Sequence, residues 1–279
     1  MRSAALVLAW TLSAAAMGAS ERDVEAARKT LLMKEKLGDG FIVERDGIFL
    51  IAGNLPRAQF ESYCTYTIGA GARALWNTYC EKKPDPFITI YLFRDDKTYR
   101  HWAKELFGDT NVSHFGYYRP WDHTMVMNIG TGGGTLVHEL THALVKPDFP
   151  KIPTWFDEGL GSLHEQCRFA SGTIVGMVNW RLPAVQKAIA DGTLVPLEKL
   201  VAMNTGQFRG DKESLHYAEA RYLCMYLQKL GVLEKFYKAF RDGFKDDTTG
   251  AKTLVRVTGK PIPDLEREWI AWVRTLRWR

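Results

Sequence analysis

The spacing of apolar and polar residues changes along the chain, from mixed strand and helix periods in the first half to helix periods in the second. Residues 21–36 form a polar stretch with helical spacing, and residues 41–52 alternate as two short strands around Asp46-Gly47, a typical hairpin turn. The pattern therefore predicts a small α+β lobe. Its further expected elements are two helices and two strands, at residues 59–80, 95–106, 87–93 and 124–128.

Beyond Trp180 the apolar spacing is almost entirely helical. We interpret the aromatic and aliphatic residues of this half as core packing and give them no chemical role. The pattern predicts an α+β lobe over residues 20–179, which carries the candidate site, and a helical lobe of the same catalytic unit over 180–279. The expected helices of the second lobe cover residues 183–190, 215–230, 233–242 and 264–276.

The first residues have the layout of a secretory signal. Arg2 precedes an apolar run from Ala4 to Met17, and small residues follow it up to Ser20. The run is shorter than the roughly 20 apolar residues that a membrane-spanning helix needs. We therefore expect residues 1–19 to be a signal peptide, the mature protein to be secreted or periplasmic, and no stable membrane insertion after signal removal.

Composition narrows the class of protein further. An apolar fraction of 46% and a charged fraction of 25% are typical of folded globular proteins rather than disordered ones. The net charge is +5, but Lys and Arg are scattered among acidic residues, so no nucleic-acid partner is expected. The sequence leaves the oligomeric state open.

The four cysteines suggest disulfides in an exported chain. Cys64 and Cys80 lie on one expected helix, however, where 16 residues at 1.5 Å each separate them by roughly 24 Å. They are too far apart to pair unless Gly69-Ala-Gly71 breaks that helix. The other two are Cys167 and Cys224, and the connectivity stays open.

The chemistry is concentrated at His138-Glu139-Leu-Thr-His142. Residues four apart lie on one face of a helix, so both imidazoles can point at a single metal ion. Glu139 then lies beside the ion without binding it, where a general base can take a proton from metal-bound water. The alternative is three polar residues on an ordinary surface helix. Apolar residues on both sides, such as Leu136 and Leu144, argue against it.

A catalytic zinc ion needs a third protein ligand, and two candidates lie downstream. Asp148 has the spacing of the long metzincin motif, but that motif requires glycine where this chain has Val145, and Pro147 crowds the segment. Glu158 is the better candidate.

The context of Glu158 favours a second helix beside the first. Thr154 can cap that helix, with Asp157 at its third position. Gly159 and Gly161 are then interpreted as places where the second helix packs closely against the first. The alternative, a solvated helix carboxylate, does not explain these glycines.

Together, His-Glu-Leu-Thr-His and Trp155-Phe-Asp-Glu158-Gly-Leu resemble the gluzincin zincins, specifically the peptidase MA-like domains of exported bacterial proteins. The resemblance covers residues 87–166 and implies an α+β zincin-like metallopeptidase with a small mixed sheet, in which His138, His142 and Glu158 bind zinc.

The resemblance also implies roles outside the two motifs. It is weaker over Tyr217–Tyr222, which is similar to the Tyr-bearing helix of that family, and Tyr217 is the suggested donor to the oxyanion. The strand at Met125–Asn128 is expected to form the cleft edge along which a peptide lies. The chain lacks the amine-binding motif of zincin aminopeptidases, so an exopeptidase gains no support.

The glycine-rich segment and the remaining histidines give less information about function. The glycines of residues 130–134 match neither a dinucleotide-binding loop nor a phosphate loop and are interpreted as a flexible entry to the metal helix. The remaining histidines are expected on the surface or in the core, and among them only His164 and His216 lie near the site in sequence.

Three functions fit these residues. The first is a zinc endopeptidase acting on a peptide or protein substrate, with Glu139 activating zinc-bound water. The second is a non-catalytic exported module that keeps zinc as a structural or peptide-binding scaffold, against which the intact Glu139 argues. The third is an amidase that cuts cell-wall peptides with the same zinc chemistry.

Overall fold

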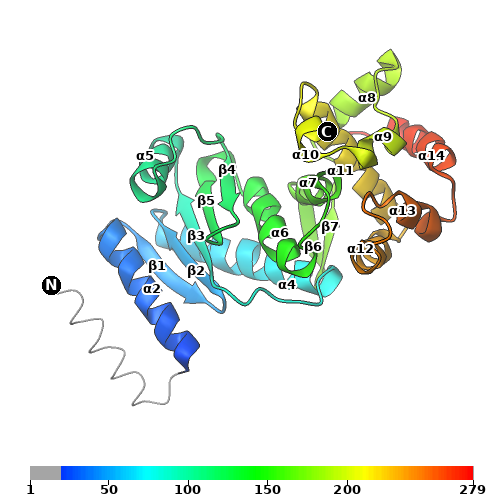
Figure 1. Ribbon diagram of the computed structural model, residues 1–279. Coiled ribbons are helices and arrows are strands. Elements are labelled where there is room, and N and C mark those ends of the chain that lie inside the picture. The colour runs from blue at the N-terminus through cyan, green and yellow to red at the C-terminus, as the bar shows by residue number, and fades with distance from the viewer. Residues whose placement is uncertain (1–19, 279) are drawn as a thin grey trace. The chain divides into compact units, whose positions relative to one another are not determined.

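A computed structural model describes residues 20–278, which form a mixed α+β protein with two compact units (Figure 1). Unit 1 combines residues 20–66 with Pro84–Gly132, and unit 2 combines Thr67–Lys83 with residues 133–278. The expected signal peptide, residues 1–19, lies outside the described residues. No helix within residues 20–278 has both the length and the hydropathy needed to cross a bilayer.

Unit 1 is built on a five-stranded mixed sheet with the strand order β1-β2-β3-β5-β4. The expected hairpin is confirmed, since β1 pairs antiparallel with β2 through a turn in which Gly47 has a φ of 58°. β3 pairs parallel with both β2 and β5. The strands are β1 (Ile42–Asp46), β2 (Phe49–Gly53), β3 (Ile88–Phe93), β4 (Gly116–Arg119) and β5 (Thr124–Asn128).

The expected cleft edge at Met125–Asn128 is wrong. β5 is an interior strand, because it pairs parallel with β3 on one side and antiparallel with β4 on the other. Its backbone groups are therefore committed to its neighbours, and β4 forms this edge of the sheet.

Helices α2 (Glu21–Leu37) and α5 (Asp96–Phe107) pack on the sheet of unit 1 (Figure 1). Both begin at side chains that cap them: Ser20 forms a capping box with Asp23, and Asp95 accepts from the amide of Thr98. Buried side chains from the helices and strands form one core cluster, which includes Met33, Leu50, Phe93, Tyr99 and Val126.

Unit 2 contains the helices expected to bind metal together with the C-terminal helices. α7 (Thr154–His164) packs against both α6 (Gly134–Asp148) and α11 (Glu213–Lys229). Because α7 is buried from Trp155 to His164, it has no solvated face that could separate two lobes. The chain passes between the two units at residues 66/67, 83/84 and 132/133, and none of these boundaries lies near residue 180.

The remaining helices follow the expected pattern with some differences. The helix expected over residues 59–80 is continuous but includes a π-helical segment, η1. Three short C-terminal helices, α9, α10 and α13, were not predicted. The bounds are α3 (Arg57–Ser62), η1 (Tyr63–Gly69), α4 (Ala70–Thr78), η2 (Ile129–Thr131), α8 (Leu182–Asp191), α9 (Leu197–Ala202), α10 (Thr205–Phe208), α12 (Leu233–Asp242), α13 (Ala251–Thr258) and α14 (Ile262–Thr275).

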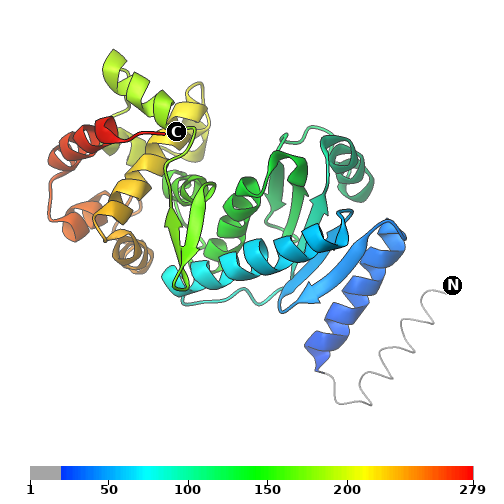
Figure 2. The same cartoon turned by 180° about the vertical axis from the view of Figure 1, so that it is seen from behind.

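A second, two-stranded sheet was also not predicted. β6 (Cys167–Ala170) and β7 (Thr173–Gly176) pair as an antiparallel hairpin, which lies against α4 (Figure 2). The expected disulfides are wrong, because all four cysteines are free thiols.

Candidate metal centre

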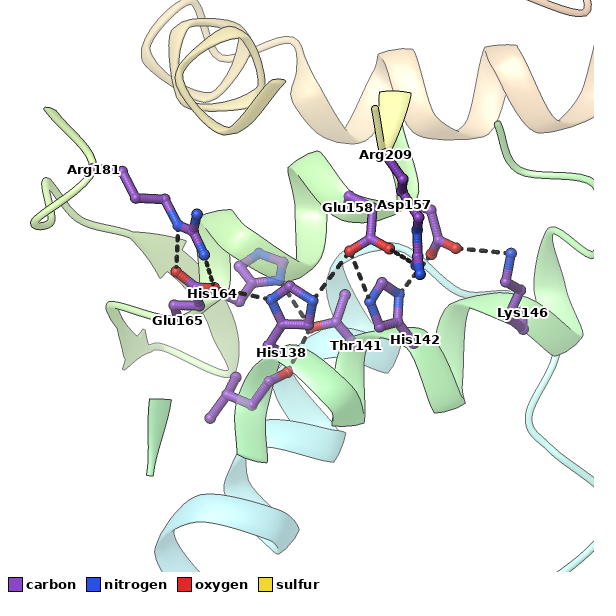
Figure 3. Close-up of polar contacts among 11 residues, drawn as sticks. His138, Thr141, His142, Lys146, Asp157, Glu158, His164, Glu165, Arg181 and Arg209 are labelled. Carbon is purple, nitrogen blue, oxygen red and sulfur yellow. Dashed lines mark hydrogen bonds and ion pairs between the residues drawn. The ribbon is translucent and has the colours of Figure 1, made fainter. Parts of the chain in front are cut away.

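Three side chains from α6 and α7 converge on one point (Figure 3). His138 and His142 lie one turn apart on α6, and their ring centroids are 4.7 Å apart. The Oε2 atom of Glu158, on α7, lies 3.3 Å from His138 Nε2 and 3.4 Å from His142 Nε2. The three ligand atoms lie within 4.8 Å of one another, so these residues could hold a metal ion.

Glycine sets how closely α7 approaches α6. A Cβ atom at Gly161 would lie 2.9 Å from His138 Nε2, so only glycine leaves the imidazole in place. The close packing expected against α6 is thus confirmed for Gly161. For Gly159 it is wrong, because a Cβ there would instead meet Cys224 Sγ at 2.9 Å and the carbonyl oxygen of Ala220 at 3.0 Å, both on α11.

The expected cap of α7 is also wrong. Pro153 occupies the N-cap position and Thr154 is the first helical residue. The Thr154 hydroxyl lies 2.7 Å from the hydroxyl of Thr205 instead of capping the helix.

Two further carboxylates lie within hydrogen-bond distance of the Nδ1 atoms of the two imidazoles. His138 Nδ1 lies 3.2 Å from Glu165 Oε1, and His142 Nδ1 lies 2.8 Å from Asp157 Oδ1. In many metal sites a carboxylate on Nδ1 orients the ring so that Nε2 can bind the ion. Here it turns both Nε2 atoms towards Glu158 Oε2. Glu165 in turn accepts two hydrogen bonds from Arg181, at 2.9 and 2.8 Å.

The site concentrates charge in a buried place. Burial alone would lower the pKa of His138, but the carboxylates of Glu158 and Glu165 raise it to about 9. Burial opposes ionisation of Glu158, but the two histidines hold its pKa well below the usual range. The carboxylates therefore attract positive charge between the two Nε2 atoms, where a metal ion can replace protons. This donor set fits a divalent cation.

Glu139 and Tyr217, the two expected catalytic residues, both lie beside this cluster. Glu139 follows His138 on α6, is half-buried, and has no hydrogen-bond partner for its carboxylate among residues 20–278. Burial raises its pKa. Tyr217, on α11, is half-buried, and its pKa is raised by burial and by the nearby carboxylate of Glu158.

Arg209 was not predicted as part of the site. It follows α10 directly and donates from Nη2 to Glu158 Oε1 at 2.7 Å (Figure 3). Nothing in the residues around Arg209 distinguishes it from a solvated arginine, and the contact spans 51 residues of sequence. Arg181 and Glu165 were missed for the same reason.

Asp148, the rejected alternative ligand, is engaged elsewhere. Its carboxylate accepts from the amides of Glu81 and Lys82 at 2.9 and 2.8 Å, from Tyr237 Oη at 3.0 Å and from Arg241 Nη1 at 2.8 Å. We call these five residues the Asp148 anchor. It holds the C-terminal end of α6.

The two histidines near the site in sequence belong to the core. His164 lies between Thr141 Oγ1 and Tyr79 Oη, at 3.2 and 3.3 Å, and burial lowers its pKa to about 3. His216 Nδ1 lies 2.7 Å from the carbonyl oxygen of Phe208. Neither joins the candidate metal ligands.

No protein-family model and no curated protein matches the sequence. The chemical interpretation therefore depends on the geometry of the site and on the motif that carries it.

Proposed function

We propose that this protein is an exported zinc metallopeptidase of the gluzincin type, with a zincin-like fold, that hydrolyses peptide bonds in a peptide or protein substrate. The observation that carries the proposal is the convergence of His138 Nε2, His142 Nε2 and Glu158 Oε2 on one point. Two imidazoles and one carboxylate are the ligand set of many catalytic zinc sites, in which the fourth position stays open.

When bound, zinc would polarise the scissile carbonyl and lower the pKa of water. Glu139 takes a proton from the attacking water and later gives it to the leaving amine, so the carboxylate is restored at the end of the cycle. Burial raises the pKa of Glu139, which suits a group that must both accept and donate a proton. Tyr217, which stays protonated because its pKa is raised, supplies a hydroxyl donor to the carbonyl oxygen.

The test is the Glu139→Gln variant of the mature protein, because glutamine keeps the shape of the side chain and removes the base. It should bind about one zinc ion per chain, as the wild type does, and should lose roughly 10²- to 10⁴-fold in hydrolysis. Glu198→Gln, at an exposed position on α9, is the control and should hydrolyse normally.

Assays should use both a peptide library and cell-wall fragments. A wild type that binds zinc and cleaves neither would support the scaffold function, and cleavage of cell-wall fragments alone would support the amidase. Unchanged hydrolysis in Glu139→Gln would mean that another group is the base.

A further inference from the structure

Glu158 is shared between the candidate metal position and a cation. Its Oε2 atom faces both histidines, whereas its Oε1 atom accepts a hydrogen bond from Arg209 Nη2 at 2.7 Å. Because both oxygens belong to one carboxylate, the guanidinium lies directly beside the point where the three ligand atoms converge.

Two other cations near the site have a different arrangement. Arg181 binds Glu165 through two hydrogen bonds, and Lys146 lies 2.8 Å from Asp157. Each of them pairs with a carboxylate that supports a histidine. Arg209 alone of these three pairs with the candidate ligand itself.

This position of Arg209 opposes metal binding. Arginine stays charged at all relevant pH values, so its guanidinium repels a divalent ion nearby. A neutral donor such as glutamine could hold Glu158 Oε1 without that repulsion. The cation therefore implies a further role that offsets the loss of metal affinity.

The remaining donors of Arg209 are available for such a role. The Arg209 side chain is 54% exposed, against 6% for Glu158. Among residues 20–278 only Nη2 of its guanidinium makes a hydrogen bond, which leaves the other N–H groups for a bound molecule. Because Arg209 pairs with the candidate ligand Glu158, these donors belong to a guanidinium next to the convergence point, where the carbonyl oxygen of a bound substrate would develop negative charge.

We propose that Arg209 is a catalytic residue that donates to the carbonyl oxygen of the substrate as that oxygen becomes negative. The inference rests on the proposed peptidase function. A charged donor is roughly twice as strong as a neutral one, so Arg209 contributes more to this oxygen than the Tyr217 hydroxyl does. Arg209 therefore weakens metal binding and accelerates the reaction.

These opposite effects define the experiment. Zinc affinity is measured by competition with a chromophoric chelator, for the wild type and for Arg209→Gln, Arg209→Lys and the control Arg168→Gln, an exposed arginine on β6. Arg209→Gln should bind zinc about threefold to tenfold more tightly, since one positive charge is removed. Arg209→Lys keeps the charge and should match the wild type, as should the control.

Two further measurements test whether Arg209 stabilises the negative charge on the carbonyl oxygen. Binding of a tripeptide with a phosphonamidate in place of the scissile amide, a tetrahedral anion, should weaken at least about tenfold in zinc-loaded Arg209→Gln. With a cleaved peptide, kcat should fall roughly 10²- to 10³-fold while KM changes little.

Each other result counts against the inference. If zinc affinity and kcat fall together, Arg209 only positions Glu158. Unchanged phosphonamidate binding and kcat would remove its catalytic role. A rise in KM confined to peptides with a free terminal carboxylate would make Arg209 a carboxylate-binding residue. A wild type that binds no zinc would overturn the peptidase proposal itself and the inference with it.

Discussion

Two buried carboxylates, Glu158 on α7 and Asp148 at the end of α6, are alike in burial and unlike in their partners. Each residue is 4% exposed, and each pKa is held below its usual range. Asp148 is surrounded by hydrogen-bond donors in the Asp148 anchor. Glu158 faces two imidazole nitrogens and one exposed guanidinium. Burial and a lowered pKa therefore do not distinguish the candidate metal ligand from Asp148, whereas the partners of the two carboxylates differ.

Substitution of the two carboxylates should separate zinc binding from stability. Glu158→Gln should weaken zinc binding by more than about a hundredfold, the upper end of what loss of an outer partner costs. Asp148→Asn should keep zinc affinity but lower the free energy of unfolding by about 3 kcal/mol, because Arg241 loses a buried counter-charge. Chelator competition and urea unfolding measure the two quantities. The ligand assignment is wrong if only Asp148→Asn loosens zinc.

The two glycines of α7 should repeat the contrast with a smaller effect. In Gly161→Ala the new Cβ meets His138 Nε2 at 2.9 Å, so the imidazole must move and zinc affinity should fall about tenfold or more. In Gly159→Ala the new Cβ meets Cys224 Sγ at 2.9 Å, which should lower the free energy of unfolding by about 1–3 kcal/mol and leave zinc affinity unchanged. Equal zinc affinity in both variants would contradict the close approach of Gly161 to His138.

Substitution of Glu165 and Asp157 tests whether the carboxylates on the Nδ1 atoms of the two histidines contribute to zinc affinity. Glu165→Gln removes the charge beside His138 Nδ1, and Asp157→Asn does the same for His142. Each should weaken zinc binding about tenfold, the lower end of the range for such partners. Glu234→Gln, at an exposed position on α12, is the control. Zinc affinity equal to that of the control would mean that the rings need no carboxylate.

Glu219, on α11, is a third buried carboxyl group. Among residues 20–278 it forms no ion pair, unlike Glu158, and accepts only one hydrogen bond, unlike Asp148. Its Oε1 atom accepts from the Val195 amide at 3.0 Å, and its Oε2 atom has no hydrogen-bond partner within the described part of the chain, residues 20–278. Burial raises its pKa from 4.5 to about 8. The folded protein therefore keeps a proton that the unfolded chain releases, so Glu219 lowers stability as the pH rises from 4.5 to about 8.

Replacing Glu219 with glutamine should remove this decrease in stability with rising pH. The free energy of unfolding of Glu219→Gln, relative to the wild type, should increase by roughly 3 kcal/mol between pH 5 and pH 8 and level off above pH 8. Urea unfolding at several pH values measures it. A difference that does not change with pH would show that Glu219 titrates normally.

The candidate metal ligands were predictable from sequence to different degrees. His138 and His142 follow from spacing along one helix, which is local information. Glu158 needed a second motif and a family resemblance. Glu165 and Arg209 could not be predicted, because their contacts depend on how helices pack across 27 and 51 residues of sequence.

In the fold, too, the features that depend on distant parts of the chain could not be predicted from sequence. The helix and strand periods located most elements, but the interior position of β5 depends on pairing between distant strands. The β6–β7 hairpin did have a local signal that was missed. Ser171 and Gly172 both have positive φ, at 50° and 76°, and Ser-Gly is a common turn sequence.

The Asp148 anchor also determines when unit 2 can be completed during synthesis. Its two amide donors, Glu81 and Lys82, are made 67 and 66 residues before Asp148, and Tyr237 and Arg241 are made 89 and 93 residues after it. The chain of Pro84–Gly132, which belongs to unit 1, is produced between the first two parts. We expect unit 1 to fold on the ribosome while unit 2 waits for its last helices. A fragment that starts at residue 133 would keep every candidate metal ligand and lose half of the donors that hold Asp148.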